Sequence, residues 1–147
     1  MPTYKTGDIF TTEALAIGHG INTQGLMGAG IAVQFRDRFP EMYEHYANEC
    51  AQSNLFPGDI MPYEVKEGRW VYNMASQELP GKNASYEWLY TSAVKALNHA
   101  HSVGIDTIAI PRIGCGIGGL SWGLVNQFLT FAESRSTGDT TFEVWTL

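Results

Sequence analysis

The amino-acid sequence predicts an α/β domain in which helices cover both faces of a central sheet. Short apolar runs that favour strands alternate with longer segments whose apolar residues recur at helical spacing. Two glycine-rich loops follow strands and precede helices, as loops do in open α/β sheets. The 147 residues suit one domain, residues 1–147, and an apolar fraction of 44% is enough for a sizeable core.

The first half of the chain alternates between strands and helices. Ala14–Ile17 is a short apolar run typical of a buried strand. The next segment is predicted to be a helix that Pro40 ends, with apolar residues four apart at Ile31, Phe35 and Phe39. A second helix is expected from Glu41 to about Ser53, with an apolar side formed by Met42, Tyr46 and Cys50. Two strands joined by the turn Lys66-Glu67-Gly68 follow, at Asp59–Val65 and Arg69–Met74.

The second half continues the alternation. A long helix is predicted from about Ser85 to Val103, closed by Gly104, with a buried stripe of Leu89, Ala93, Leu97 and Ala100. Thr107–Ile110 is an apolar strand that Pro111 ends. The next helix runs from about Ser121 to Ser134, and its buried side is expected to carry Leu124, Phe128 and Phe131. The last strand is Thr141–Leu147.

Composition excludes several classes of protein. The net charge of −6 leaves no basic surface for a nucleic-acid backbone, so backbone N–H groups and helix N-termini would have to hold an anionic ligand. Cys50 and Cys115 form no disulfide framework, and the four histidines have no metal-ligand spacing, so neither a metal nor a cofactor is expected. No signal run or membrane-length apolar stretch is present, which predicts a cytoplasmic protein, expected to be a monomer.

The two glycine-rich loops are the strongest functional signal. The first glycine loop is Met27–Gly30 and the second glycine loop is Gly114–Gly119. Glycine lets the backbone approach a phosphate closely, and the helix that follows offers unpaired N–H donors, so the two loops are predicted to cradle a diphosphate. The alternative is that the glycines only make turns. The sequence has no G-x-x-x-x-G-K-[ST] motif, and Gly25–Gly30 is a poor dinucleotide fingerprint.

Three segments together resemble the macrodomain family. They are Gly7-Asp8-Ile9, Asn22 followed by Leu26–Ile31, and Ile110–Leu120. The resemblance covers nearly the whole chain and is nearest to the terminal ADP-ribose protein glycohydrolase branch, close to bacterial antitoxins that remove ADP-ribose from DNA. It implies a three-layer α/β/α fold with a mixed, roughly six-stranded sheet, and ADP-ribose as the ligand.

The resemblance also assigns roles to residues. Asp8 would accept a hydrogen bond from the adenine amino group, although an Asp there can instead form a turn. Ile9 would contact the adenine, and Asn22 would hydrogen-bond the distal ribose unless it only forms a turn. The diphosphate would lie between two sets of loop residues, which are Gly28, Ala29, Gly30 and Ile31 and, on the other side, Gly114, Cys115, Gly116, Ile117 and Gly118.

Two residues allow both a structural and a chemical interpretation. His19 is either a structural histidine or, as in macrodomains resembling the yeast ADP-ribose 1″-phosphate phosphatase, a catalytic residue. Cys115 is either a nucleophile at a helix N-terminus or a small residue that lets the second glycine loop pack closely.

Two departures from the glycohydrolase branch bear on catalysis. Gln77 stands where that branch has a lysine, and Gly118 where it has a catalytic aspartate, while Lys82 could swing in only by leaving the solvent. We therefore expect hydrolysis of ADP-ribosyl esters, such as ADP-ribosylated Asp or Glu or O-acetyl-ADP-ribose, by a water that Asn22 and the loops position. The alternatives are a non-catalytic ADP-ribose reader and a phosphatase that uses His19. The expected partners are ADP-ribose or ADP-ribosylated protein, with ADP-ribosylated nucleic acid as a further candidate.

Overall fold

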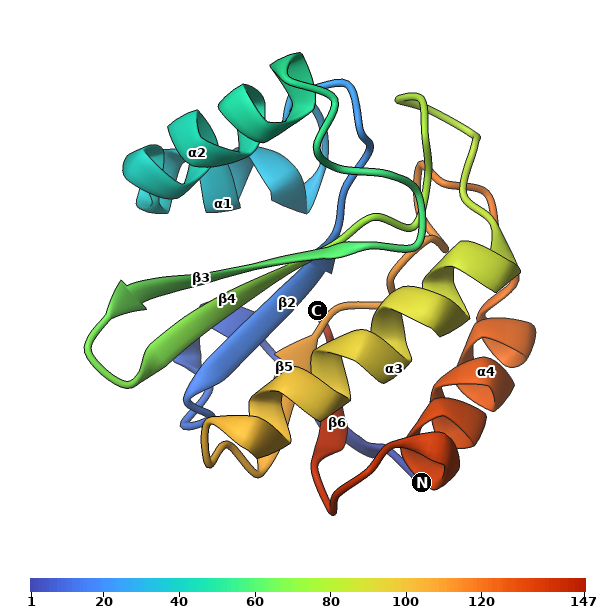
Figure 1. Cartoon of the computed structure of the whole chain (residues 1–147). Coiled ribbons are helices and arrows are strands. Elements are labelled where there is room, and N and C mark those ends of the chain that lie inside the picture. The colour runs from blue at the N-terminus through green and yellow to red at the C-terminus, as the bar shows by residue number, and fades with distance from the viewer.

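A mixed six-stranded sheet forms the centre of the molecule, in the strand order β1-β6-β5-β2-β4-β3 (Figure 1). The computed structural model describes residues 1–147, and its strands are β1 Thr3–Thr6, β2 Ala16–Gly20, β3 Ile60–Lys66, β4 Arg69–Met74, β5 Thr107–Ile110 and β6 Thr141–Thr146. Every neighbouring pair is parallel except β3 and β4, which form an antiparallel hairpin. The carboxyl ends of β2, β4 and β5 therefore meet at one edge.

Helices cover both faces of this sheet, which confirms the predicted three-layer architecture (Figure 1). One face carries α1 (Ile31–Arg38) and α2 (Pro40–Ala51), and the other carries α3 (Tyr86–Ser102) and α4 (Trp122–Arg135). A short 3₁₀ helix, η1, spans Ile9–Thr11. The core has two parts, a larger cluster of 17 buried residues between the sheet and α3 with α4, and a smaller one of 9 under α1 and α2. No helix combines the length and apolarity needed to cross a membrane.

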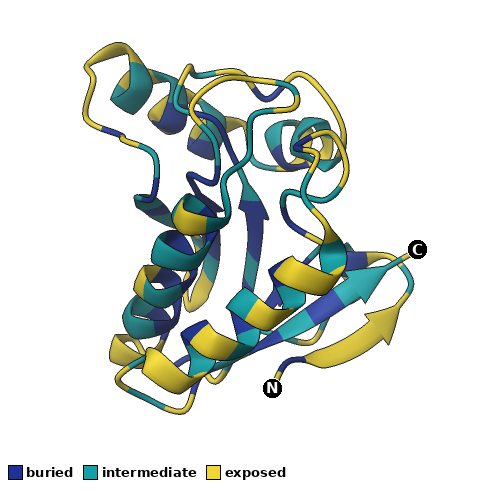
Figure 2. Ribbon diagram, turned by 90° about the vertical axis from the view of Figure 1, so that its right-hand side faces the viewer, coloured by how far each residue is buried: buried dark blue, intermediate teal, exposed yellow.

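The strands differ from the sequence expectation at two places. Strand β2 begins at Ala16 and continues through His19 to Gly20, so it lies later than the expected 14–17. Strand β1 could not be expected from apolar patterning because all four of its residues are exposed at the sheet edge (Figure 2). Only the resemblance to macrodomains implied a strand before Asp8.

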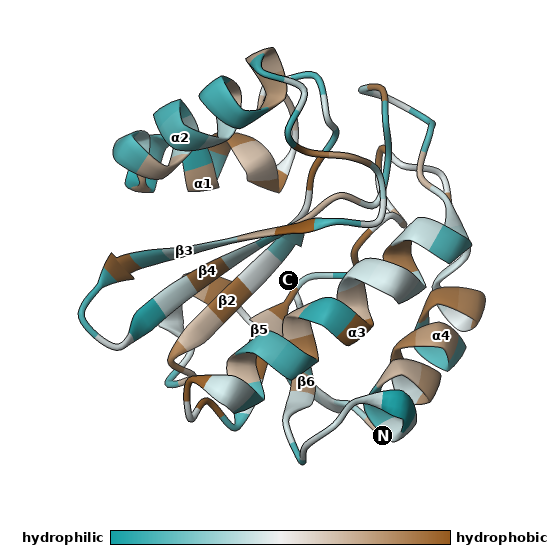
Figure 3. Cartoon of the chain, in the orientation of Figure 1, coloured by the Kyte–Doolittle hydropathy of each residue, from teal (hydrophilic) through white to brown (hydrophobic).

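The buried side of α4 was predicted wrongly. Leu124 and Phe131 are 45% and 48% exposed, and the fully buried positions are Val125, Leu129 and Ala132. The predicted set, with Phe128, and the buried set both repeat at i, i+4 and i+7, so the helix is apolar on two adjacent sides. In Figure 3 brown segments alternate with teal and white ones along α4. Periodicity alone could not decide between them. By contrast, the predicted stripe of α3 is confirmed, since Leu89, Ala93, Leu97 and Ala100 are fully buried.

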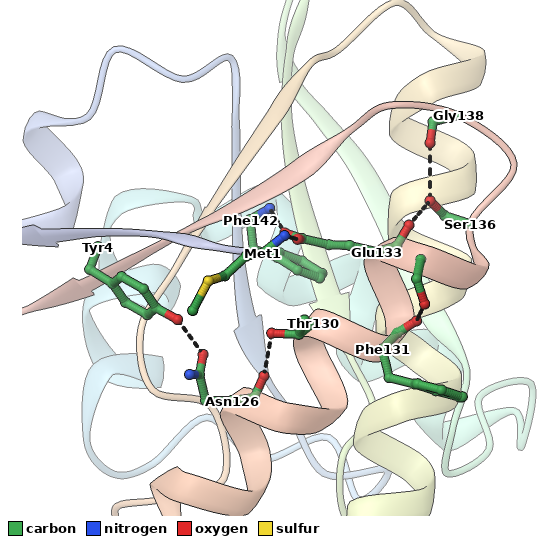
Figure 4. Close-up of polar contacts among 10 residues, drawn as sticks. Met1, Tyr4, Asn126, Thr130, Phe131, Glu133, Ser136, Gly138 and Phe142 are labelled. Carbon is green, nitrogen blue, oxygen red and sulfur yellow. Dashed lines mark hydrogen bonds and ion pairs between the residues drawn. The ribbon is translucent and has the colours of Figure 1, made fainter.

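Polar contacts attach the edge strand and α4 to the sheet (Figure 4). The Tyr4 hydroxyl donates to Asn126 Oδ1 at 2.8 Å. The carboxylate of Glu133 accepts a hydrogen bond from the Phe142 N–H at 2.7 Å and lies 2.8 Å from the amine of Met1. These contacts join α4 to β1 and β6, and α4 is the helix that begins just after the second glycine loop.

Candidate functional site

A cleft of about 470 Å³ opens at the carboxyl ends of β2, β4 and β5. Its walls come from residues 20–22 and 26–32 after β2, from 76–77 and 80–81 after β4, and from 111–114 and 116–118 after β5. Volumes of several hundred cubic ångströms are typical of small-molecule sites, which lie preferentially at such strand ends in α/β folds.

Nine of the thirteen residues predicted for the site line this cleft. They are Asn22, Gly28, Ala29, Gly30, Ile31, Gly114, Gly116, Ile117 and Gly118. The two glycine loops face each other, since a Cβ on Gly30 would lie 3.4 Å from the Cδ1 atom of Ile117. The structure thus brings together, across one cleft, two loops that are more than eighty positions apart in the sequence.

Backbone N–H groups without a partner are concentrated in these loops. In the first loop, the N–H groups of Gly28, Ala29 and Gly30 donate to no acceptor in the protein, and Ile31 begins α1 with no side-chain cap. In the second loop, the same holds for the N–H groups of Gly114, Gly116, Ile117 and Gly118. Because unpaired backbone donors are costly unless solvent or a ligand satisfies them, these two rows suit an anion that lies between them.

The side chains of the cleft are also suited to an anion. Arg112 is the only charged residue that lines it, and no carboxylate does. The Arg112 guanidinium stacks over the Trp122 ring, 4.9 Å from its centroid, which holds the cation at the rim. The remaining polar lining side chains are those of Asn22, Ser76 and Gln77.

Asn22 mainly holds the first loop in place. Its Oδ1 accepts hydrogen bonds from the Gln24 N–H at 2.9 Å and the Tyr46 hydroxyl at 2.9 Å, while its Nδ2 donates to the Leu26 carbonyl at 2.8 Å. The Tyr46 hydroxyl is also 2.8 Å from the Asn22 carbonyl. Of the amide's donors, one N–H is left for a ligand. The Asn22 side chain therefore forms the turn and also lines the cleft.

Asp8 and Ile9 lie outside the cleft. Asp8 caps η1, with Oδ1 accepting the Phe10 N–H at 3.0 Å, as the turn alternative expected. Its side chain is exposed and its other oxygen makes no hydrogen bond in the protein, whereas Ile9 is only 5% exposed. Their adenine contacts stay predictions.

The geometry supports the structural alternative for His19 rather than the catalytic one. Its side chain is 0% exposed, does not line the cleft, and stacks on Phe35 with ring centroids 3.8 Å apart. The Nε2 atom lies 2.7 Å from Asn73 Oδ1, and burial lowers the pKa of His19 to about 4, so the ring is neutral at pH 7. The reason is that β2 extends past His19, and its alternation turns this side chain into the core under α1.

Cys115 is the one predicted residue of the second loop that does not line the cleft. The half-buried thiol contacts the core below α4 and lies 3.5 Å from the Ile113 carbonyl. Burial raises the pKa of the Cys115 thiol, the opposite of what a nucleophile needs. The geometry of Cys115 therefore supports the packing alternative.

The residues at the two departures have structural roles of their own. Gln77 lines the cleft, and its Nε2 donates to the carbonyls of Leu79 at 2.7 Å and Gly81 at 3.1 Å, which orders the wall after β4. Gly118 is buried, and a Cβ there would lie 2.8 Å from the Gly114 carbonyl oxygen.

Lys82 lies at the rim rather than in the cleft. Its aliphatic chain crosses Gly119, where a Cβ would come within 2.5 Å of the Lys82 Cγ atom. The side chain packs along the second loop and does not line the cleft.

Sequence reasoning missed the lining residues Ser76 and Arg112 and the Pro80-Gly81 wall. Arg112 stands inside the Pro-Arg-Ile-Gly motif and could have been noticed there. Ser76 carries no such signal, because a serine two residues beyond a strand reads as a turn.

A sequence profile of the Macro domain matches residues 19–129. The chain therefore belongs to the macrodomain family. It is 31% identical over 148 residues to the human ADP-ribose glycohydrolase OARD1. This alignment covers 99% of this chain and 91% of the human protein. It is 27% identical over 135 residues to the DNA ADP-ribosyl glycohydrolase of Mycobacterium tuberculosis, covering 90% of this chain but 38% of that relative.

Solved structures agree with the family. The macrodomain of Mycobacterium tuberculosis DarG superposes with a TM-score of 0.88 at 25% identity, covering 100% of this chain and 98% of that one. The resemblance inferred from the motifs and the predicted fold class are thus confirmed.

Proposed function

We propose that this chain binds ADP-ribose in the cleft and hydrolyses ADP-ribosyl esters. The observation that carries the proposal is the pair of facing loops with unpartnered N–H groups, in a cleft that no carboxylate lines. A diphosphate carries several acceptor oxygens on each of its two phosphates, so it offers hydrogen-bond acceptors to both rows at once. The names of the human and mycobacterial relatives, both ADP-ribosyl glycohydrolases, support the same ligand.

The strand order suggests how the ligand lies. Asp8 follows β1 at one edge of the sheet, the two loops follow β5 and β2, and Ser76 follows β4. From β1 to β4 there are four strand spacings of about 4.8 Å, or roughly 19 Å. The adenine would lie towards Asp8, the diphosphate between the loops, and the distal ribose towards Asn22 and β4.

The lining residues limit the chemistry. No Asp, Glu, His, Lys or Cys lines the cleft, so no side chain there has a pKa suited to general acid or base catalysis. A water held by the ligand's phosphate and the loop N–H groups would attack the anomeric carbon, and the Asn22 N–H would orient the ribose. A carboxylate leaves without protonation, which is why an ester is the preferred substrate.

The test is release of ADP-ribose from a protein ADP-ribosylated on glutamate. Wild type is expected to release it over several turnovers, whereas an Ala29→Glu variant, whose first loop would repel the diphosphate, should release it at least tenfold more slowly at low substrate concentration. Release by wild type no faster than by this variant would contradict the hydrolase proposal. Asn22→Ala is a poor control because the Asn22 side chain holds the loop.

A non-catalytic reader is the second candidate, favoured by the same lack of acid and base groups in the cleft. It predicts ADP-ribose binding without any release, even at stoichiometric protein. The mycobacterial relative is named for action on ADP-ribosylated DNA. A parallel assay with ADP-ribosylated DNA therefore shows whether this chain prefers the protein ester or the DNA substrate. We further propose that the protein is cytoplasmic, since Cys50 and Cys115 are both free thiols, which suits a reducing compartment. We also propose that it is a monomer.

A further inference from the structure

Ser76 has an unusual environment on the floor of the cleft. The residue is 1% exposed, lines the cleft, and is the only residue there with a side-chain hydroxyl. Its Oγ atom is buried and makes no hydrogen bond. A buried hydroxyl without a partner costs about 1–3 kcal/mol, so a serine at this place weakens the free protein.

The neighbours of Ser76 are built closely around this hydroxyl. A Cβ on Gly20 would lie 2.7 Å from Ser76 Oγ and 2.9 Å from Ile113 Cγ2, so any larger residue there would force both side chains to shift. Gly20 pairs with Met74 in the β2–β4 ladder, which places Ser76 beside the start of the segment that leads to Asn22. A serine hydroxyl moves between three staggered positions by rotation about one bond, so it can turn from Gly20 towards the cleft.

We propose that Ser76 is a substrate-binding residue that hydrogen-bonds the distal ribose and thereby distinguishes ADP-ribose from ADP. The inference rests on the proposed function and adds to it the residue that reads the end of the ligand. The hydroxyl is both a donor and an acceptor, as is each ribose hydroxyl, so the two are matched partners. The place of β4 in the sheet, on the far side of both loops from Asp8, puts Ser76 at the ribose end of the ligand.

The test compares Ser76→Ala and Ser76→Cys with wild type, each titrated by calorimetry with ADP-ribose and with ADP. Losing one hydrogen bond to a neutral partner is expected to weaken ADP-ribose binding by about 3- to 10-fold. Binding of ADP, which lacks the distal ribose, should stay within about twofold. The cysteine variant keeps the volume of the side chain and should behave like alanine.

Thermal unfolding of the free proteins gives the second readout. Ser76→Ala should leave Tm unchanged or raise it, because it removes an unpartnered polar group. The matched control is Ser92→Ala, at a serine that is also fully buried but donates to the Leu89 carbonyl at 3.0 Å in α3. This control should lower Tm and leave both affinities at the wild-type value.

Each other outcome overturns the inference. Ser76→Ala that binds ADP-ribose as tightly as wild type, or that weakens ADP-ribose and ADP equally, would show that Ser76 does not read the distal ribose. A fall in Tm with unchanged affinities would make it a packing residue. Wild type that fails to bind ADP-ribose at all would instead refute the proposed function, and this inference with it.

Discussion

Replacing Ala29 by glutamate would place a carboxylate on the first glycine loop, beside the proposed position of the diphosphate. Ala29 is exposed, lines the cleft and lies outside every helix and strand, so the longer side chain disturbs no packing. The neutral variant Ala29→Gln has nearly the same size. The difference between the two variants therefore isolates charge from bulk.

The size of the effect follows from Coulomb's law. Two phosphate charges about 6 Å from the new carboxylate repel it by about 1.4 kcal/mol even in water, which weakens binding about tenfold. Within the cleft the effective dielectric constant is lower, so tenfold is a lower limit. Calorimetric titration with ADP-ribose should show Ala29→Gln within about threefold of wild type and Ala29→Glu at least tenfold weaker. Added salt should reduce the difference in affinity between the two variants, because it screens the repulsion.

Equal affinities of the glutamate and glutamine variants would refute the reasoning, because they would mean that no anion lies near this loop. Thermal unfolding is the control for folding, and both variants should melt close to wild type. A loss of binding that accompanies a large fall in Tm of both variants would indicate a damaged loop rather than repulsion.

Three further predictions concern other positions. Arg112→Gln should weaken ADP-ribose binding by about fivefold in calorimetric titrations, and by more at low salt. An unchanged affinity would show that the Arg112 guanidinium does not face the ligand. Burial lowers the pKa of His19 to about 4 in the folded protein, against 6.5 for histidine in the unfolded chain. The stability that the neutral buried ring contributes is therefore present above pH 6.5 and is lost as the pH falls towards 4. Wild type should therefore lose about 2 kcal/mol more unfolding free energy than His19→Gln between pH 8 and pH 5 in urea titrations, and parallel losses would contradict this. Gly118→Ala should lower Tm because the new Cβ would meet the Gly114 carbonyl oxygen. Gly116→Ala should leave Tm unchanged, because a Cβ there would have no atom within 4 Å. Equal melting temperatures of the two variants would contradict the packing described.

Much of the site was predictable because its signal is local. Glycines between a strand and a helix indicate a close approach of the backbone to a ligand, and both loops line the cleft as expected. The residues that were misplaced depend on strand boundaries. The catalytic alternative for His19 came from the resemblance to phosphatase-like macrodomains, whereas β2 continues through His19 to Gly20 and the side chain is buried in the core.

Other features depend on tertiary packing and could not be predicted. The apolar residues of α4 lie on two adjacent sides of the helix, and only the tertiary structure shows that Val125, Leu129 and Ala132 are the ones buried in the larger core cluster. Phe128 stacks near Tyr86 at 5.6 Å and is partly covered, whereas Phe131 stays half exposed. Gly118 stands where the glycohydrolase branch has an aspartate, and the structure shows that the loop's own backbone requires a small residue there. The role proposed for Ser76 depends on its buried, unpartnered hydroxyl, which is a property of the tertiary structure and leaves no signal in the sequence.

The most direct test of the central claim is a crystal structure of the protein with ADP-ribose bound. The claim predicts the diphosphate within hydrogen-bond distance of the free N–H groups of both loops, from Gly28 to Ile31 and from Gly114 to Gly118, with the distal ribose towards Asn22 and Ser76. Density for the ligand elsewhere on the molecule, or a diphosphate that contacts neither loop, would contradict it.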